Sequence, residues 1–245
     1  GNWGEVGVQR IIDQCVSAGI ERIYWRAFGG GLAMYQSQLE QPWHLSDVDR
    51  FKHKIDYNAL LWDSARSQWG KPQARTARLD YRHWDPLDIA VQYCRQQGVE
   101  LIVWYTLNEE DHGWIGLLSR YARAHPEYAW IARDGARRFT NMSFGFPEVR
   151  AHKRASVREL LDYGVDGLLL DFIRRAGRFR VVNEEMVHFH YYWDDDGACQ
   201  YGYESPIVEA FLAETGRDAR TIPNADAQWI QFRADYNTRM LQEIR

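Results

Sequence analysis

A carboxylate ends one of the most apolar stretches of the chain. Asp171 follows the leucines of GLLLD, and Arg174 and Arg175 come shortly after it. An acid at the end of a strand in a parallel α/β protein lies at the edge where loops build active sites. Burial disfavours the charged form of a carboxyl group and an arginine favours it, so either neighbour would tune such an acid. Asp171 is therefore predicted to be catalytic; the alternative is a carboxylate that caps the next helix or pairs with Arg174.

A second polar group ends another apolar run, WYTLNEEDHG. Asn108 is followed by Glu109, two more acids and His112. Cleavage of a glycosidic bond generally needs two carboxyl groups, roughly 5–5.5 Å apart for retention of configuration and roughly 6.5–9.5 Å apart for inversion. Asp171 and Glu109 end neighbouring strands, so they are predicted to form such a pair. The acids could equally form a solvated loop, and His112 could be a loop histidine instead of a proton shuttle.

Two histidines later in the chain offer a different chemistry. His188 and His190 would share one face of a strand, and with Asp194 they could bind a metal ion. A His-x-His pair is a weak indication of metal binding, and the aromatic residues around it fit a lid over a sugar equally well. The prediction is that no metal and no cofactor is needed.

The residues above are positioned by alternating helices and strands. Apolar runs predict strands at 21–28, 100–107 and 166–173. Apolar periodicity with glycine and proline punctuation predicts helices at 8–16, 85–98, 115–125, 147–163, 205–215 and 226–244. Asp85 is the predicted N-cap of the second helix, and Asp166 is predicted to stabilise the turn before the third strand.

Such alternation predicts an α/β fold with parallel strands, of the (β/α)8 TIM-barrel type. Three strands are too few for a closed barrel, so residues 1–245 are expected to form one incomplete barrel domain, from about the first helix to the fourth. The long segments 32–83 and 176–203 would lie at the site face. Alternatively, short strands lie within those two segments. An open doubly wound sheet would place its site at the same edge.

Composition narrows the function further. The 245 residues carry a net charge of −4 with acids and bases interspersed, which is unlike a nucleic-acid-binding protein. No apolar run is long enough to span a membrane, and no signal peptide or phosphate-binding glycine motif is visible. Three cysteines without metal spacing predict buried thiols. The many aromatic residues suit either a large core or stacking on sugar rings.

Four segments together resemble a bacterial family. They are RIYWRAFGGGLAMYQS, DPLDIAVQYCRQQGVELIVWYTLN, FGFPEVRAHKRASVRELLDYGVDGLLLDF and WIQFRADYNTRML. The chain resembles the family-10-like glycosyl hydrolases, (β/α)8-barrel enzymes related to the hydrolase domain of the periplasmic protein that processes poly-N-acetylglucosamine. The resemblance leaves out residues 38–80 and 176–205. It implies a carbohydrate substrate and a periplasmic or secreted protein.

The resemblance also implies roles for individual residues. Asp171 matches the acid of the fourth barrel strand, Tyr35 belongs to a Tyr-x-Ser pattern, and Trp104 and Asn108 match a Trp-x-x-Asn-like strand end. Arg174 matches an arginine that would face the substrate.

Two positions depart from the family pattern. Phe172 stands where many relatives have a second acid, and Phe28 stands where an arginine is frequent.

The sequence thus predicts a glycoside hydrolase that acts on a poly- or oligosaccharide. Asp171 and Glu109 are its predicted catalytic residues, and the predicted substrate-binding residues are Tyr35, Trp104, Asn108, His112 and Arg174. Phe172 also motivates an alternative, a carbohydrate-binding barrel without catalysis. A metal-dependent hydrolase is a third and less favoured hypothesis.

Overall fold

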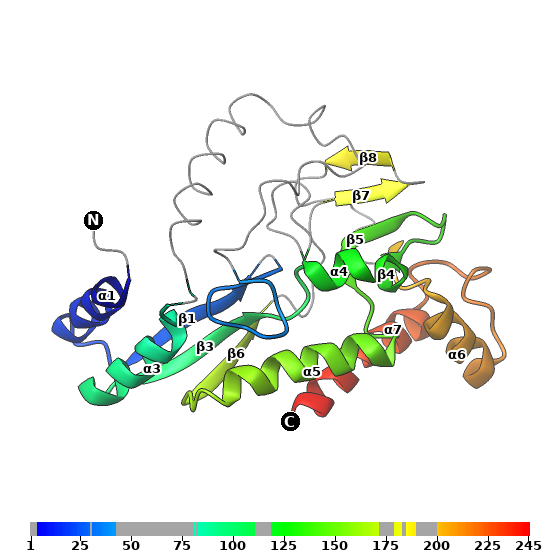
Figure 1. The fold of residues 1–245 in the computed structure, drawn as a ribbon. Coiled ribbons are helices and arrows are strands. Elements are labelled where there is room, and N and C mark those ends of the chain that lie inside the picture. The colour runs from blue at the N-terminus through cyan, green and yellow to red at the C-terminus, as the bar shows by residue number, and fades with distance from the viewer. Residues whose placement is uncertain are drawn as a thin grey trace.

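The described chain is a mixed α/β structure with two four-stranded sheets (Figure 1). The structure is a computed structural model, and it describes residues 4–29, 31–42, 81, 83–110, 119–171, 179–182, 185–189 and 200–245. The first sheet has the order β2 (Leu32–Ala33), β1 (Arg22–Gly29), β3 (Glu100–Thr106) and β6 (Gly167–Asp171). Its three long strands confirm the predicted strands to within two residues at each end.

Strands β1, β3 and β6 are parallel, so their carboxyl ends lie at one edge of the sheet. Trp104 is opposite Arg26 of β1 and Leu169 of β6. Thr106 is opposite Asp171, and the amide of Leu107 donates to the Asp171 carbonyl over 2.8 Å. This register carries the acid-bearing end of β6 to the polar end of β3.

One face of the first sheet is covered by helices. The helices are α1 (Glu5–Ser17), α3 (Pro86–Gln97) and α5 (Pro147–Leu161), and they confirm predicted helices. Their apolar stripes pack on the β3 residues Leu101 and Val103 in one continuous core. The opposite face keeps large apolar side chains in contact with solvent among the described residues, including Tyr24 at 52% and Leu169 at 36% exposure. The sheet is therefore a half-covered layer.

Two aspartates stabilise this layer as the sequence predicts. The Asp85 side chain caps α3 by accepting from the Leu87 amide over 2.9 Å, and it also accepts from the Tyr163 hydroxyl over 2.6 Å. The Asp166 carboxylate accepts from the Leu101 amide over 2.8 Å, which ties the start of β6 to β3. Asp166 thus has the structural role that was predicted for it.

The sequence did not predict strands β4 and β5 of the second sheet. Its order is β4 (Ala129–Ile131), β5 (Arg137–Met142), β7 (Phe179–Val182) and β8 (Glu185–Phe189), with antiparallel pairing. β4 is too short to show a pattern, and the sequence of β5 is mostly polar. β7 and β8 lie within 176–203, where short strands were the alternative to the interpretation as an incomplete barrel.

The remaining helices agree with expectation. They are α6 (Ser205–Thr215) and α7 (Ala227–Ile244), which lie at the same end of the molecule as β4 and β5 in Figure 1. Between β3 and β4 come α4 (Arg120–Ala124) and the 3-10 helix η4 (Pro126–Tyr128), so α4 starts five residues later than the predicted helix, whose first residues lie outside the described ranges.

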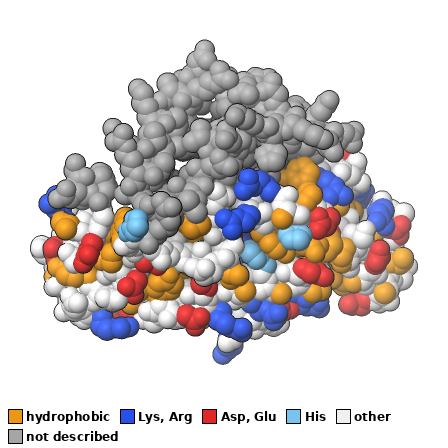
Figure 2. Space-filling view, in the orientation of Figure 1, with side chains coloured by type: hydrophobic (Ala, Val, Ile, Leu, Met, Phe, Trp, Pro, Cys, Tyr) orange, Lys and Arg blue, Asp and Glu red, His pale blue; other side chains and the backbone are white. Residues whose placement is uncertain are grey.

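The described parallel strands form an open sheet and not a closed barrel. Acidic and basic side chains are interspersed over the face of the molecule in Figure 2. None of the helices in the described ranges combines the length and the apolar character needed to cross a bilayer. Cys94 is buried in α3, and Cys15 is partly buried in α1.

Candidate functional site

Trp104 and Asp171 meet at the carboxyl edge of the first sheet. The indole Nε1 of Trp104 donates a hydrogen bond to Oδ2 of Asp171 over 3.1 Å. Both side chains project from the sheet face that the helices leave uncovered, because Trp104 and Thr106 alternate with the buried Val103 and Tyr105 of β3. Asp171 is only partly buried. The predicted strand-end acid is thus held in a defined orientation by an aromatic neighbour.

Arg26 joins this pair to the second predicted acid. Its guanidinium carbon lies 5.7 Å from the centre of the Trp104 ring, and its Nη2 lies 3.4 Å from Oε2 of Glu109. The Arg26 side chain is 44% exposed, whereas that of Glu109 is 14% exposed. Arg26, Trp104, Glu109 and Asp171 are called the strand-end cluster below.

Gly29 makes room for Arg26. A Cβ atom at position 29 would collide with the guanidinium group of Arg26, which folds back over the end of its own strand. Glycine has no Cβ, so the arginine can take this path between the strand and Glu109. The position of the cation in the strand-end cluster therefore depends on a neighbour that itself carries no functional group.

The strand-end cluster has the parts of a carbohydrate site. Trp104 offers a flat apolar ring for a sugar, and the arginine and the two carboxylates offer donors and acceptors for hydroxyl groups. The hydrolysis of a glycosidic bond generally uses two carboxyl groups, and the cluster contains two, Asp171 and Glu109. An ion pair with arginine suits a carboxylate that acts in its charged form, as Glu109 would.

Tyr35 has a different place in the structure. Its side chain is fully buried, and its hydroxyl donates to Oε2 of Glu159 on α5 over 2.8 Å. The Ser37 hydroxyl and the Gln38 amide donate to the same carboxylate over 2.5 and 2.6 Å. Burial, together with the charge of Glu159, raises the pKa of Tyr35. The Tyr-x-Ser pattern therefore fastens the segment after β2 to α5, and Tyr35 makes no described contact with the strand-end cluster.

Asn108 is also buried, with 1% exposure. Its backbone carbonyl accepts from Nδ2 of Asn141 on β5 over 2.6 Å, and its own Nδ2 has no partner among the described atoms. Asn108 thus connects the end of β3 to the second sheet. Its amide would be available to a substrate only if the end of β3 opened toward the strand-end cluster.

Several predicted residues cannot be placed. His112 and Arg174 lie outside the described residues, as does Phe172. The backbone of His188 lies in β8, but its side chain, His190 and Asp194 are outside the description, so the metal hypothesis falls on these residues. Among the side chains that are described, no three metal-binding groups come together.

The second acid of the NEED run belongs to the interior. Glu110 is fully buried and forms an ion pair with Lys153 of α5, which is also fully buried. Glu40, with 1% exposure, accepts from the Ser156 hydroxyl over 2.8 Å and lies 2.8 Å from Nε2 of His152. These residues, Glu40, Glu110, His152, Lys153 and Ser156, are called the buried charge cluster. The hypothesis of a solvated loop is wrong for Glu110.

Opposite charges offset the cost of burial in this cluster. Burial by itself would lower the pKa of Lys153, but the charges of Glu110 and Glu40 outweigh burial and raise it. Burial would likewise raise the pKa of Glu40, but the neighbouring imidazole of His152 and the charge of Lys153 hold it below its ordinary value. Lys153 also lies 5.3 Å from the ring of Phe28 and 5.8 Å from that of Tyr105. The cluster therefore supports the ends of β1 and β3 from the helix side.

Two residues of these clusters, Arg26 and Lys153, were not predicted to be functional or buried. The sequence around Arg26 does mark it as unusual, since it is a cation at the centre of an apolar strand and shares a face with Tyr24. The sequence around Lys153 does not, because this residue stands in a run of charged residues on α5 that looks like a solvated helix face. Only packing against the strand ends reveals that this lysine is buried.

Comparisons with known proteins give a likeness of fold. No protein-family model matches the sequence, and no curated protein matches it with significance. Among solved structures, the chain is similar to an α-L-fucosidase, isoenzyme 2 from Paenibacillus thiaminolyticus. The TM-score is 0.53 and the sequence identity is 13%, over 99% of this chain and 27% of that protein. The chain thus spans about a quarter of the length of the enzyme that it resembles, and it shares a glycosidase-like α/β fold with that part.

Proposed function

We propose that the chain is the carbohydrate-active part of a glycoside hydrolase of the β/α-barrel type. The observation that carries the proposal is the strand-end cluster, in which Trp104 contacts Asp171 over 3.1 Å while Arg26 bridges Trp104 and Glu109. The fold likeness to part of an α-L-fucosidase supports it. The sequence resemblance to family-10-like glycosyl hydrolases also supports it, and in this proposal residues 1–245 would form one incomplete barrel.

The cluster suggests a division of roles. Asp171 would act as the acid or base, or as the acid that orients the substrate, with its carboxylate aimed by the Trp104 indole. Glu109 would be the second carboxylate, kept charged by Arg26. Trp104 would stack on a sugar ring, and His112 and Arg174 would contact the substrate. Asn108 is buried, so it would contact the substrate only after the end of β3 opened. Tyr35 is left out, since its buried hydroxyl is already bonded to Glu159.

The test is the hydrolysis of a panel of oligosaccharides and aryl glycosides by the full chain and by Asp171→Asn and Glu109→Gln variants. Removal of a catalytic carboxylate is expected to lower kcat by a factor of about 10²–10⁴, the range of general acid–base catalysis. Asp162→Asn is the matched control, because Asp162 is an exposed carboxylate just after α5. If both site variants cleave as fast as the control, the proposal is wrong.

A second candidate function is carbohydrate binding without cleavage. It is favoured by the engagement of both carboxylates, Asp171 by the Trp104 indole and Glu109 by Arg26. Calorimetry would then detect glycan binding in the unmodified chain, and Trp104→Ala would weaken it, while no product would form. Product formation that depends on Asp171 would exclude this alternative.

A further inference from the structure

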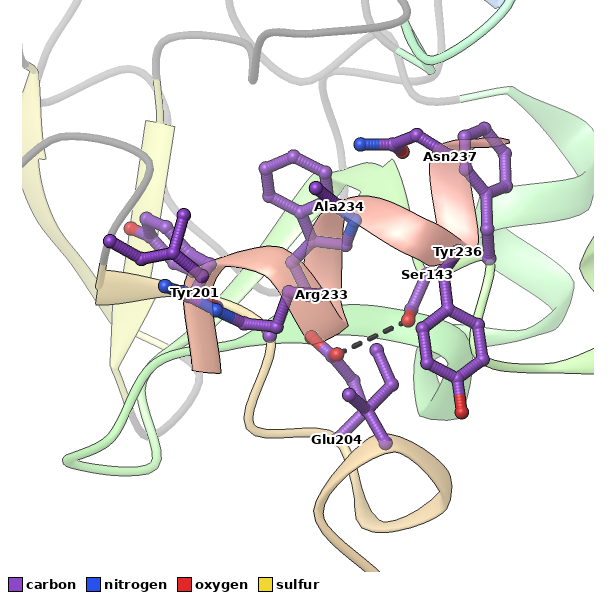
Figure 3. A pocket seen from close by; sticks show the side chains of 12 residues that line it. Ser143, Tyr201, Glu204, Arg233, Ala234, Tyr236 and Asn237 are labelled. Atoms are coloured by element: carbon purple, nitrogen blue, oxygen red, sulfur yellow. Dashed lines mark hydrogen bonds between the residues drawn. The ribbon is translucent and has the colours of Figure 1, made fainter. Parts of the chain in front are cut away.

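A cavity lies between the β4–β5 segment and the helices α6 and α7 (Figure 3). It encloses about 180 Å³. An apolar cavity of about 150 Å³ holds one benzene molecule, so the space fits a single six-membered ring. The residues around it include Trp130, Ser143, Tyr201, Glu204, Arg233 and Ala234. None of these residues belongs to the strand-end cluster.

Four of the twelve residues that line the cavity are aromatic. Trp130 and Tyr201 lie with their ring centres 5.9 Å apart, and Tyr236 of α7 lines the cavity as well. Aromatic walls bind flat apolar faces, whether of an aromatic compound or of a sugar ring. The aromatic walls therefore favour a flat ring, and the polar groups of the cavity determine which charge and substituents that ring carries.

Glu204 is the main polar group of the cavity. It is fully buried, and its Oε1 accepts from the Ile131 amide over 2.6 Å, while its Oε2 accepts from the Ser143 hydroxyl over 3.1 Å (Figure 3). A carboxylate can accept about four hydrogen bonds, so each oxygen has room for a further donor. Burial raises the pKa of Glu204 to about 7. Near neutral pH the group can therefore either accept from a hydroxyl or donate to one.

Arg233 argues against an ionic ligand. Its side chain donates to the backbone carbonyls of Tyr201, Trp229 and Asn224, and its guanidinium carbon lies 5.1 Å from the centre of the Trp229 ring. Its positive charge acts on Glu204 and favours the ionised carboxylate. A cationic ligand would be repelled by Arg233, and an anionic ligand would be repelled by Glu204. A neutral ring with hydroxyl groups avoids both repulsions.

We propose that this cavity is a second binding site, which takes one neutral hydroxylated six-membered ring, such as a single pyranose unit, stacked against Trp130 and Tyr201 and hydrogen-bonded to Glu204. An unsubstituted aromatic ring would leave the spare acceptor capacity of Glu204 unused. The site goes beyond the proposed function, because it shares no residue with the strand-end cluster and would hold sugar whether or not that cluster cleaves it.

The experiment measures the binding of a panel of neutral monosaccharides to the full chain by calorimetry and saturation-transfer NMR, with toluene and piperidine as hydroxyl-free aromatic and cationic comparison rings. Ala234→Leu fills the cavity from an exposed position of α7, and Ala213→Leu is the matched control on α6. The expected result is monosaccharide binding that Ala234→Leu weakens at least about tenfold and Ala213→Leu leaves unchanged. Equal affinity in these two variants would overturn the proposal.

Glu204→Gln gives an independent test, since glutamine keeps the size of the side chain but not its charge. Loss of a charge-assisted hydrogen bond is expected to weaken sugar binding about tenfold and to leave the binding of toluene, which has no hydroxyl group, unaffected. Preferential binding of either comparison ring would overturn the assignment of a neutral sugar. Glycan cleavage is measured in parallel with monosaccharide binding, so a failure of this site and a failure of the strand-end site are read from separate assays.

Discussion

The replacement of Lys153 by methionine tests whether the buried charge cluster supports the strand ends. Methionine fills similar volume but leaves Glu110 and Glu40 buried without their cation, and Oε2 of each already lacks a hydrogen-bond partner in the described structure. Breaking a buried ion pair on one side typically costs about 3–5 kcal/mol. Domains of this kind have a total stability of about 5–15 kcal/mol. We therefore expect Lys153→Met to lose a large part of the free energy of unfolding.

The assay is urea unfolding followed by circular dichroism, with Arg158→Met as the control for removal of an exposed cation from the same helix. The control should change stability by no more than about 0.5 kcal/mol. Adding Glu110→Leu to Lys153→Met removes both partners and should recover most of the loss. A loss below about 1 kcal/mol, or a double variant no more stable than the single one, would refute the reasoning.

Three further predictions concern Gly29, Tyr35 and Glu204. Gly29→Ala should push the Arg26 guanidinium away from Glu109 and lower glycan turnover or binding about as much as Arg26→Met does. The double variant should show no additional loss, and full additivity of the two effects would contradict this prediction. Tyr35→Phe should lower the free energy of unfolding by about 1–3 kcal/mol, because the hydrogen bond to Glu159 is lost, and it should leave glycan affinity unchanged. Reduced glycan affinity in a folded variant would instead indicate that Tyr35 contacts the substrate. The pKa of Glu204 is raised from 4.5 to about 7 by burial, so its neutral form favours the folded state, and stability should fall by about 3 kcal/mol as the pH rises from 4.5 through 7. Glu204→Gln should flatten that decline in urea unfolding at pH 5 and pH 8, and equal slopes in both proteins would refute the assignment.

Local sequence patterns were enough to place the strands of the first sheet and the helices that cover it. Apolar runs bounded by glycine placed β1, β3 and β6 within two residues, because the strand face that packs against the helices has to be apolar. Asp85 and Asp166 were recognised as structural because caps and turns act within a few residues of the chain. The acids at strand ends were found for the same reason, since the end of an apolar run is itself a local feature.

Packing between distant elements determines which polar residues face solvent and which partners they contact. Glu109 and Glu110 are neighbours in the sequence, yet one contacts Arg26 at the sheet edge and the other is buried against Lys153. Tyr35 matches a site pattern but donates to Glu159, which is 124 residues away. The polar strand β5 and the cavity around Glu204 likewise depend on contacts with distant segments. Such pairings arise from packing between elements, and the spacing of residues along one element carries no record of them.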